Sequence, residues 1–187
     1  RECGYAIWAA YGAHVNITGF TIQNGTCGVV LWDELSNVYG NVIKDNIHDG
    51  IYMEHPECEN NVIYGNTIID NGQNGIHLDG VYDNIISRNN IRGNNLTGIS
   101  LVFSADDNII SGNNIENNGF DGICLDASNT NIIYGNNITD NRAYGIHTKF
   151  KSKNNSIFYN NFINNSINAF IFKSPGSPND IWHSGYP

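Results

Sequence analysis

One repeated pattern runs along almost the whole chain, and it restricts the fold more than any other feature. The pattern is Asn-x-Ile-x-Gly-Asn-x-Ile-x-x-Asn, and its clear copies begin at Asn61, Asn108 and Asn131. With looser copies included, the pattern has evenly spaced centres at Gly40, Gly65, Arg88, Gly112, Gly135 and Tyr159. A fixed period of this size predicts a solenoid, in which each repeat buries its apolar side against its neighbours.

A second motif fills the other half of each repeat, and it alternates apolar residues with variable ones. It reads Gly-Ile-Tyr-Met at Gly50, Gly-Ile-His-Leu at Gly75 and Gly-Ile-Ser-Leu at Gly98. Similar copies follow Gly28, Gly122 and Gly145, and the segments at Gly4 and Ala169 align with them at the same interval. Apolar residues one and three places after a glycine indicate a strand with one buried face.

The Asn motif carries two further short strands, one on each side of its Gly-Asn corner. Isoleucine and valine dominate the apolar positions, as strands prefer. The sequence therefore predicts an all-β fold, a parallel β-helix of about eight coils of roughly 24 residues. Parallel crossovers are right-handed in nearly all proteins, so we expect a right-handed solenoid.

A leucine-rich repeat is the other solenoid class that shares this period and an asparagine ladder. That class needs a Leu-x-x-Leu-x-Leu pattern and a helix or looser segment on the convex side. This chain is poor in leucine, and its β-branched residues fall on every side of the predicted coil. The parallel β-helix is therefore the better interpretation.

The chain contains 33 asparagines, and most of them have a structural explanation. Asparagine tolerates the left-handed conformation at a sharp corner, and its amide bonds to nearby backbone. When coils stack in register, each asparagine also reaches its counterpart one coil away. The expected ladders are Asn41, Asn66, Asn89, Asn113, Asn136 and Asn160; Asn61, Asn84, Asn108, Asn131 and Asn155; and Asn46, Asn71, Asn94, Asn118, Asn141 and Asn165.

Length and continuous repeats predict a single β-helix domain over residues 1–187. We expect residues 1–24 to form the first coil, residues 25–165 the regular coils, and residues 166–187 the last coil with a closing segment. The chain opens inside a repeat, which indicates a mature or excised segment. No capping helix is recognisable at this start, although solenoids normally need end caps.

The charge balance restricts the class of partner. Net charge is −9, with only nine lysines and arginines, which argues against a nucleic acid or an anionic membrane surface as partner. No apolar run approaches the roughly 18 residues that a transmembrane helix needs, so we expect no membrane insertion.

Two cysteines near the start are candidates for a disulfide. Cys3 and Cys27 each precede a repeat glycine and lie one repeat apart, so we expect them to stack on adjacent coils. Their Cα separation would be near the strand spacing of roughly 4.8 Å, which is within the disulfide range. With six Asn-x-Ser/Thr sequons, this predicted Cys3–Cys27 bond favours an extracellular, cell-surface or periplasmic location.

The outer face of the Gly-Ile-x-Leu sheet gathers reactive side chains more densely than any other face of the predicted coil. Residues two places after each glycine form one outward column: Ala6, Val30, Tyr52, His77, Ser100, Cys124, His147 and Ile171. Residues four places after form a second: Trp8, Trp32, Glu54, Asp79, Val102, Asp126, Lys149 and Lys173. The columns predict a functional face, and the alternative is an ordinary solvated strand face of mixed charge.

Aromatic residues at the start of this face are the candidate substrate-binding residues. Trp8 and Trp32 on neighbouring coils would form a flat platform on which a sugar ring stacks, with Tyr52 and Glu54 beside it. The alternative is that the two tryptophans shield the end of the rod or form a subunit contact.

Carboxylates on the second column are candidates for calcium binding or catalysis. Glu54 and Asp79 are one coil apart, so their carboxylates would approach within about 5 Å and could bind Ca²⁺. Asp79 and Asp126 are two coils apart, about 9–10 Å at the backbone, a separation that inverting glycosidases use.

The remaining candidate catalytic residues carry amines and imidazoles. His77 lies beside Asp79, and His147 lies beside Lys149, so both histidines could act as acid/base groups. A lyase would use Lys149 or a histidine to take the C5 proton of a uronate, with Ca²⁺ neutralising the substrate carboxylate.

Both repeat motifs together resemble the right-handed β-helix repeats of the NosD-like proteins, and the resemblance covers nearly the whole chain. That family belongs to a wider class of carbohydrate-binding proteins and sugar hydrolases, and many copies occur in archaeal surface proteins. The class includes pectate-lyase-like lyases, polygalacturonases and mannuronan epimerases, which implies a polysaccharide partner on one sheet. Tyr144-Gly-Ile-His147 is similar to the tyrosine–histidine motif of the epimerases, and residues 173–182 resemble a closing segment.

Three functions are compatible with the sequence. We favour an extracellular module that binds polysaccharide along the strand face from Trp8 to Lys149. A structural protein that self-associates through its coil ends into a surface layer or filament is the second hypothesis, because an open coil end presents unpaired backbone groups. A polysaccharide lyase, epimerase or hydrolase is the third hypothesis, and an enzyme is less favoured than a binding module.

Overall fold

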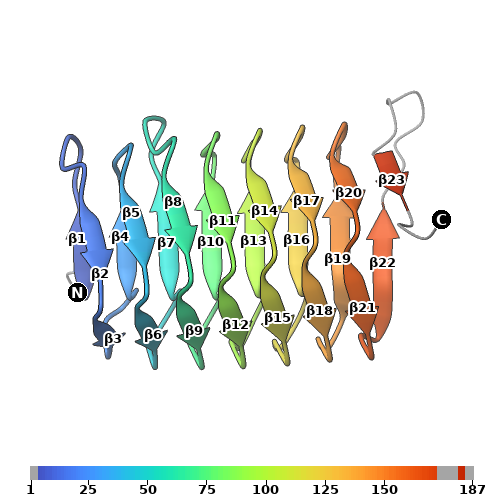
Figure 1. Cartoon of the computed structure of the whole chain (residues 1–187), viewed down its shortest axis with the longest axis horizontal. Coiled ribbons are helices and arrows are strands. Elements are labelled where there is room, and N and C mark those ends of the chain that lie inside the picture. Colours follow the sequence, from blue (N-terminus) through green and yellow to red (C-terminus); the bar gives the residue numbers. More distant parts are fainter. Residues whose placement is uncertain (1–3, 172–180, 184–187) are drawn as a thin grey trace.

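The protein is a rod of stacked coils. It is described by a computed structural model that covers residues 4–171 and 181–183. These residues form 23 short strands in three sheets, and the coils follow one another from β1 at one end of the rod to β22 near the other (Figure 1). Within the described residues no helix is long and apolar enough to cross a membrane.

Each coil contributes one strand to each sheet, in the order sheet A, sheet B, sheet C. Sheet A consists of β1 (Ile7–Ala9), β4 (Val29–Leu31), β7 (Ile51–Glu54), β10 (Ile76–Asp79), β13 (Ile99–Val102), β16 (Ile123–Asp126), β19 (Tyr144–Lys149) and β22 (Ile167–Ile171). Sheet B consists of β2 (Asn16–Thr18), β5 (Asn37–Tyr39), β8 (Val62–Tyr64), β11 (Ile85–Ser87), β14 (Ile109–Ser111), β17 (Ile132–Tyr134), β20 (Ser156–Phe158) and β23 (Ile181–His183). Sheet C consists of β3 (Thr21–Gln23), β6 (Val42–Lys44), β9 (Thr67–Ile69), β12 (Asn90–Arg92), β15 (Asn114–Glu116), β18 (Asn137–Thr139) and β21 (Asn161–Ile163).

Every neighbouring pair within a sheet is parallel, which confirms the predicted parallel β-helix. The solenoid has about 7 turns with a repeat of about 23 residues. Figure 1 shows the consequence: equivalent strands of successive coils lie side by side along the rod, so residues one coil apart in sequence become neighbours. A residue column in the sequence is therefore a stripe on the surface or in the core.

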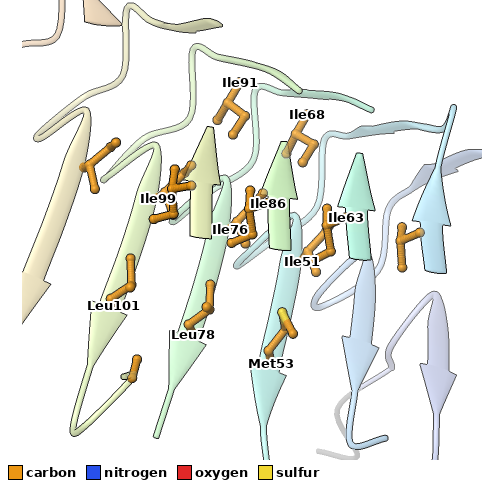
Figure 2. Packing of buried hydrophobic residues seen from close by; sticks show 14 of the residues in the cluster. Ile51, Met53, Ile63, Ile68, Ile76, Leu78, Ile86, Ile91, Ile99 and Leu101 are labelled. Atoms are coloured by element: carbon orange, nitrogen blue, oxygen red, sulfur yellow. The ribbon is translucent and has the colours of Figure 1, made fainter. Parts of the chain in front are cut away.

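The core is a set of apolar columns that run the length of the rod. Strand β7 shows the pattern, because Ile51 and Met53 are fully buried while Tyr52 and Glu54 between and after them point outward. Figure 2 shows Ile51 aligned with its equivalents in the next coils, and Met53 aligned with Leu78 and Leu101. Full burial of each such side chain contributes roughly 1.5–3 kcal/mol of transfer free energy.

All three predicted asparagine ladders are present, and they satisfy buried backbone groups at the corners. Asn66 is representative: its Oδ1 accepts from the backbone N–H and the Nδ2 of Asn41 at 3.0 and 3.1 Å. Its own Nδ2 donates to the carbonyl of Val38 at 2.8 Å and to Oδ1 of Asn89 at 3.0 Å. Each amide therefore holds three coils together, which is the structural role that the repeat pattern predicts.

The glycine at the centre of the Asn motif has a backbone conformation that explains its recurrence. Gly65 and Gly112 both have φ of 63°, in the left-handed region where other residues are strained. Two coils use another residue at this corner and keep the same conformation, with φ of 54° at Arg88 and 55° at Tyr159. The corner geometry is thus set by the stacked coils, and glycine is the residue that adopts it at least cost.

The first coil has a different register from the predicted one. Ile7 pairs with Val29, whereas the regular repeat predicts Leu31, two places later in the chain, as its partner. Trp8 consequently lies beside Val30 and not beside Trp32. A shift of two places preserves the alternation of inward and outward side chains, so the sequence pattern could not reveal it.

The last coil also departs from the regular repeat. His147 pairs with Phe170 and Thr148 pairs with Ile171, one place earlier in the chain than predicted. Phe170 therefore ends the outward column in the place where Ile171 was expected. Lys173, which was expected to end the second column, lies outside the described residues.

The predicted disulfide is not supported. Cys3 lies outside the described residues, and no two of the described cysteines are joined by a disulfide. In the first coil the backbone N–H of Ala6 donates to the carbonyl of Cys27 at 3.1 Å. In a parallel pair this bond places Tyr5 opposite Cys27, because the first coil is shorter than the regular repeat.

Candidate functional site

The outer face of sheet A brings the predicted functional residues into two continuous stripes. Register pairs connect one residue to the next along each stripe. The first stripe is Trp8, Val30, Tyr52, His77, Ser100, Cys124, His147 and Phe170. The second stripe contains Glu54, Asp79, Val102, Asp126 and Lys149. Apart from the corrected ends, the register of the predicted columns is confirmed, but Val30, Ser100 and Cys124 in the first stripe are buried.

The tryptophans do not form the predicted flat platform. The rings of Trp8 and Trp32 are in contact, with centroids 5.3 Å apart, but their planes are nearly perpendicular at 84°. The shifted register of the first coil explains this, since the residues are not opposite each other in the sheet. Trp32 instead lies nearly parallel to the imidazole of His55, at 22° and 6.4 Å.

A pocket of about 300 Å³ lies at the end of this face where the strands of sheet A lead into the loops before sheet B. It is lined by Trp32, Glu54, His55, Pro56, Asp79 and Gly80. The indole Nε1 of Trp32 is buried and has no hydrogen-bond partner. Glu54 and Asp79 are direct neighbours in the register, as predicted. The pocket thus combines an aromatic ring and two carboxylates.

A second pocket, of about 320 Å³, lies at the start of the strands of sheet A, where the loops from sheet C enter. Its lining residues include Asp49, Tyr52, Gln73 and His77. Asp49 is almost fully buried, and its Oδ2 lies 3.4 Å from Nδ1 of His77. A carboxylate accepts and does not donate, so this contact places a proton on Nδ1. The other ring nitrogen of His77, Nε2, is buried and has no hydrogen-bond partner.

Tyr52 lines the second pocket and interacts with Glu54, which lines the first. Its ring contacts the imidazole of His77, with centroids 5.2 Å apart. Burial, a hydrogen bond with the carboxylate of Glu54 and the nearby charges of Asp79 and Asp49 raise the pKa of Tyr52. Its hydroxyl therefore remains protonated at neutral pH and is available only as a neutral hydrogen-bonding group.

A compact cluster of polar residues forms on coil seven, the coil that contains β19. It surrounds the buried carboxylate of Asp121, which precedes β16 on the coil before. Oδ2 of Asp121 lies 3.2 Å from Nδ1 of His147 and 3.8 Å from Nζ of Lys149, and its Oδ1 accepts from the backbone N–H of Tyr144. The rings of Tyr144 and His147 are 4.2 Å apart. Lys149 also lies over the ring of Phe120, 5.6 Å from its centroid. His147 and Lys149, both predicted site residues, are therefore brought together.

Other predicted catalytic residues are not part of that cluster. His77 lies three register steps from His147, through Ser100 and Cys124, and each step is about 4.8 Å. Asp126 is the register neighbour of Lys149, yet the ion pair of Lys149 is with Asp121. The set predicted as one catalytic group is thus divided between two centres.

Two important residues, Asp49 and Asp121, were missing from the predicted site. Both precede a repeat glycine directly, and each is followed in the next coil by a histidine two places after its glycine. That position lies two residues before a strand of sheet A, and its side chain lies beside the outward stripe. The shared position of these two acids relative to His77 and His147 was the available sequence signal.

The candidate metal site is incomplete within the described residues. No three His, Cys, Asp or Glu side chains gather there in an arrangement that could hold a metal ion. Glu54 and Asp79 are neighbours, as predicted. Two carboxylates alone do not complete a Ca²⁺ site, because Ca²⁺ in proteins is coordinated by about six to eight oxygen atoms. The calcium site therefore stays a prediction.

Fold and site together define a class: a parallel β-helix with a polar and aromatic stripe along one sheet. The family model for NosD, described as periplasmic copper-binding protein, matches residues 1–142 and again residues 104–186. The chain therefore belongs to the NosD family. Among curated proteins, none shows significant similarity to it.

Solved structures show the same architecture. The periplasmic alginate epimerase AlgG superposes with a TM-score of 0.71 and 28% identity, covering 76% of this chain and 35% of that one. The Dettilon tailspike protein superposes with a TM-score of 0.76 and 24% identity, covering 85% and 36%. The pectate lyase Pel9A superposes with a TM-score of 0.62 and 14% identity, covering 80% and 46%. The last two likenesses show the fold alone, and the chain spans about a third of the epimerase's length.

The copper in the family's description does not fit the described residues. Copper ions prefer clustered imidazole, thiolate or thioether ligands. The described cysteines lie on separate coils, Met53 is fully buried in the core, and His77 and His147 are three register steps apart. Together with the missing three-residue clusters, this arrangement gives no copper site within residues 4–171 and 181–183.

Proposed function

We propose that the outer face of sheet A binds a polysaccharide, with the chain of sugars running along the stripe from Trp32 to Lys149. The observation that carries this proposal is the alignment of pockets, aromatic rings and hydrogen-bonding groups from consecutive coils in one register. A polymer with repeating units suits a surface with repeating units, since each coil presents its groups at a fixed step. The alginate epimerase likeness supports the same class of partner.

The individual groups match what a sugar offers. Sugar rings stack on aromatic faces, and their hydroxyls both donate and accept hydrogen bonds. Trp32 and two carboxylates line one pocket, and the polar side chains of Tyr52, Gln73 and His77 line the other.

Binding assays on a panel of alginate, pectate, hyaluronan and a neutral glucan test this proposal. Calorimetry on the parent chain is expected to detect at least one ligand in the panel. Trp32→Ala is expected to weaken that binding about tenfold, which corresponds to about 1.4 kcal/mol. The matched control is Tyr64→Ala, which removes an exposed aromatic ring from sheet B. Loss of affinity in both variants alike, or no binding by the parent, contradicts the proposal.

The cluster on coil seven favours a second candidate, acid–base chemistry on a uronate unit of the bound polysaccharide. His147 and Tyr144 are in ring contact, and Lys149 offers a cation for the uronate carboxylate. In this candidate function His147 or Tyr144 exchanges the C5 proton, and Asp121 orients the imidazole. Incubation of alginate, pectate and hyaluronan with the chain, followed by proton NMR and ultraviolet detection of unsaturated products, tests it. His147→Asn should abolish any activity that Ser111→Ala on sheet B leaves intact, and equal activity in both variants excludes this role.

We further propose an extracytoplasmic location, since both the family's description and the name of AlgG include the word periplasmic. Fractionation of cells that produce the native protein tests this, and recovery with cytoplasmic markers contradicts it. The archaeal surface-protein subset that the repeats resemble stays a prediction.

A further inference from the structure

Sheet A contains two copies of one structural unit, three coils apart. Each unit consists of a buried aspartate directly before a repeat glycine and a histidine two places after the glycine of the next coil. The first unit is Asp49 with His77, and the second is Asp121 with His147. Both aspartates use Oδ2 for Nδ1 of the histidine and Oδ1 for a backbone N–H of the next coil, at Asn74 and Tyr144 respectively.

The two units differ in the charge of the residue beside the histidine. Two places after His147 is Lys149, which contacts the carboxylate of its unit at 3.8 Å. Two places after His77 is Asp79, whose register neighbour is Glu54. Lys149 in turn has Asp126 as its register neighbour. Equivalent positions on one face therefore present a cation beside a carboxylate at one unit and two carboxylates at the other.

The same polarity extends over the surrounding coils. Residues 33–83 contain ten of the eighteen acidic residues of the chain and a single lysine, Lys44. Residues 142–153 contain four of the nine basic residues and no acidic one. On sheet A itself the change is from the pair Glu54 and Asp79 to Lys149 beside Asp126, and the charges of a ligand along this sheet must match both.

We propose that the face binds a polysaccharide in which acidic and neutral sugars are mixed, with a neutral sugar at the Asp49–His77 unit and a uronate at the Asp121–His147 unit. This inference rests on the proposed function and specifies its ligand. At the first unit a neutral sugar avoids the like charges that a uronate carboxylate would meet at Asp49, Glu54 and Asp79. At the second unit, Lys149 binds the uronate carboxylate.

The spacing of the units suits one continuous ligand. His77 and His147 are joined by three register steps, so the two imidazoles are about 14 Å apart along the rod at roughly 4.8 Å per step. A short run of an extended polysaccharide covers this distance. The residues between them in the stripe, Ser100 and Cys124, are buried, so a bound chain would pass above this position and not contact their side chains.

Calorimetry in a chelator-containing buffer distinguishes this ligand class from a homopolymer of uronates. Hyaluronan oligosaccharides, which alternate a uronate with a neutral amino sugar, are the mixed probe, and alginate oligosaccharides of equal length are the homopolymer. We expect hyaluronan to bind at least about tenfold more tightly, since like charges facing each other across an interface are strongly unfavourable. Asp79→Asn should strengthen alginate binding several-fold, whereas the charge-matched control Asp45→Asn, whose exposed side chain follows β6 in sheet C, should not.

The outcomes separate this inference from the proposed function. Tighter binding of alginate than hyaluronan, unchanged by Asp79→Asn, overturns the mixed-polymer ligand and leaves polysaccharide binding standing. Addition of Ca²⁺ should leave the preference intact; a reversal towards alginate also overturns the inference, because the acidic region then binds uronates through the cation. If none of alginate, pectate, hyaluronan and the neutral glucan binds, the proposed function and this inference are both overturned.

Discussion

Asp121 and His147 lie on adjacent coils, and Oδ2 of the buried aspartate is 3.2 Å from Nδ1 of the imidazole. The same carboxylate lies 3.8 Å from Nζ of Lys149. One buried anion thus fixes the two basic groups that face the outer surface of sheet A at coil seven. This relationship makes the aspartate a positioning residue for the candidate site.

Asp121→Asn should reduce stability more than a similar change beside it. The asparagine keeps an acceptor for the backbone N–H of Tyr144 but no longer offers a charged partner to His147 and Lys149. We expect the free energy of unfolding to fall by about 1–3 kcal/mol, measured by urea denaturation at neutral pH. Asp126→Asn is the control, because its side chain is partly exposed, and its effect should stay within about 0.5 kcal/mol. Equal losses in the two variants would show that the ion pair contributes nothing specific.

Asn89→Ala tests the structural role of the ladders. Oδ1 of Asn89 accepts from the backbone N–H and the Nδ2 of Asn66, and its own Nδ2 donates to Ile63 and Asn113. Truncation leaves buried donors and acceptors without partners, so we expect a loss of at least about 2 kcal/mol in the free energy of unfolding. The neighbouring Asn90→Ala removes an outward residue that accepts one hydrogen bond from Asn114, and should cost less than about 1 kcal/mol. Similar values for both variants contradict the ladder account.

Much of this fold could be predicted from the sequence, because the repeat period and the alternation of apolar residues are properties of stacked strands. The ladders were predictable for the same reason, since equivalent asparagines recur at the repeat step. The registers of the first and last coils were not. They depend on corner geometry at irregular repeats, and a shift of two places leaves the alternation around Trp8 unchanged.

The candidate site was predictable only in part. Columns of outward residues follow directly from the repeat, so Tyr52, His77, His147 and Lys149 could be identified. Asp121 precedes its strand, and nothing in the alternation shows that it turns towards His147 in the next coil. Calcium binding and self-association through the coil ends remain predictions, because no contact among the described residues tests either one.

Asp33 should make the stability of the protein depend on acid pH. Burial alone raises the pKa of this carboxyl, but hydrogen bonds from Ser36 and from the backbone N–H groups of His14 and Glu34 outweigh it and hold the pKa below its ordinary value of 3.8. A depressed folded-state pKa contributes stability that is fully present above the unfolded-state pKa and is lost as the pH falls through the folded-state value. Urea denaturation between neutral pH and strong acid should therefore show a loss of stability below about pH 4. In Asp33→Asn this part of the loss should be missing. If the free energy of unfolding of that variant falls with decreasing pH as steeply as that of the parent, the assignment is wrong.

Two buried thiols should be unreactive in the folded protein. Burial raises the pKa of Cys58 to about 12. Burial also raises the pKa of Cys124 to about 12, although Lys149 acts in the opposite direction. Because the thiolate is the nucleophile, we expect negligible alkylation of both residues by iodoacetamide at mildly alkaline pH, and full alkylation after unfolding in urea. Peptide mass spectrometry reads each cysteine separately, and rapid native modification of Cys124 would show that the stripe is open at this position.

The central claim is that sheet A, and not sheet B or C, is the binding face. Backbone NMR of the labelled chain tests it most directly, with titration by whichever member of the panel of alginate, pectate, hyaluronan and neutral glucan binds most tightly. We predict that shifts concentrate on the outward residues of sheet A, from Trp32 and Tyr52 through His77 to His147, while Tyr64 and Tyr134 on sheet B do not respond. Shifts centred on sheet B or sheet C, or no shifts with any of the four polysaccharides, would contradict the claim.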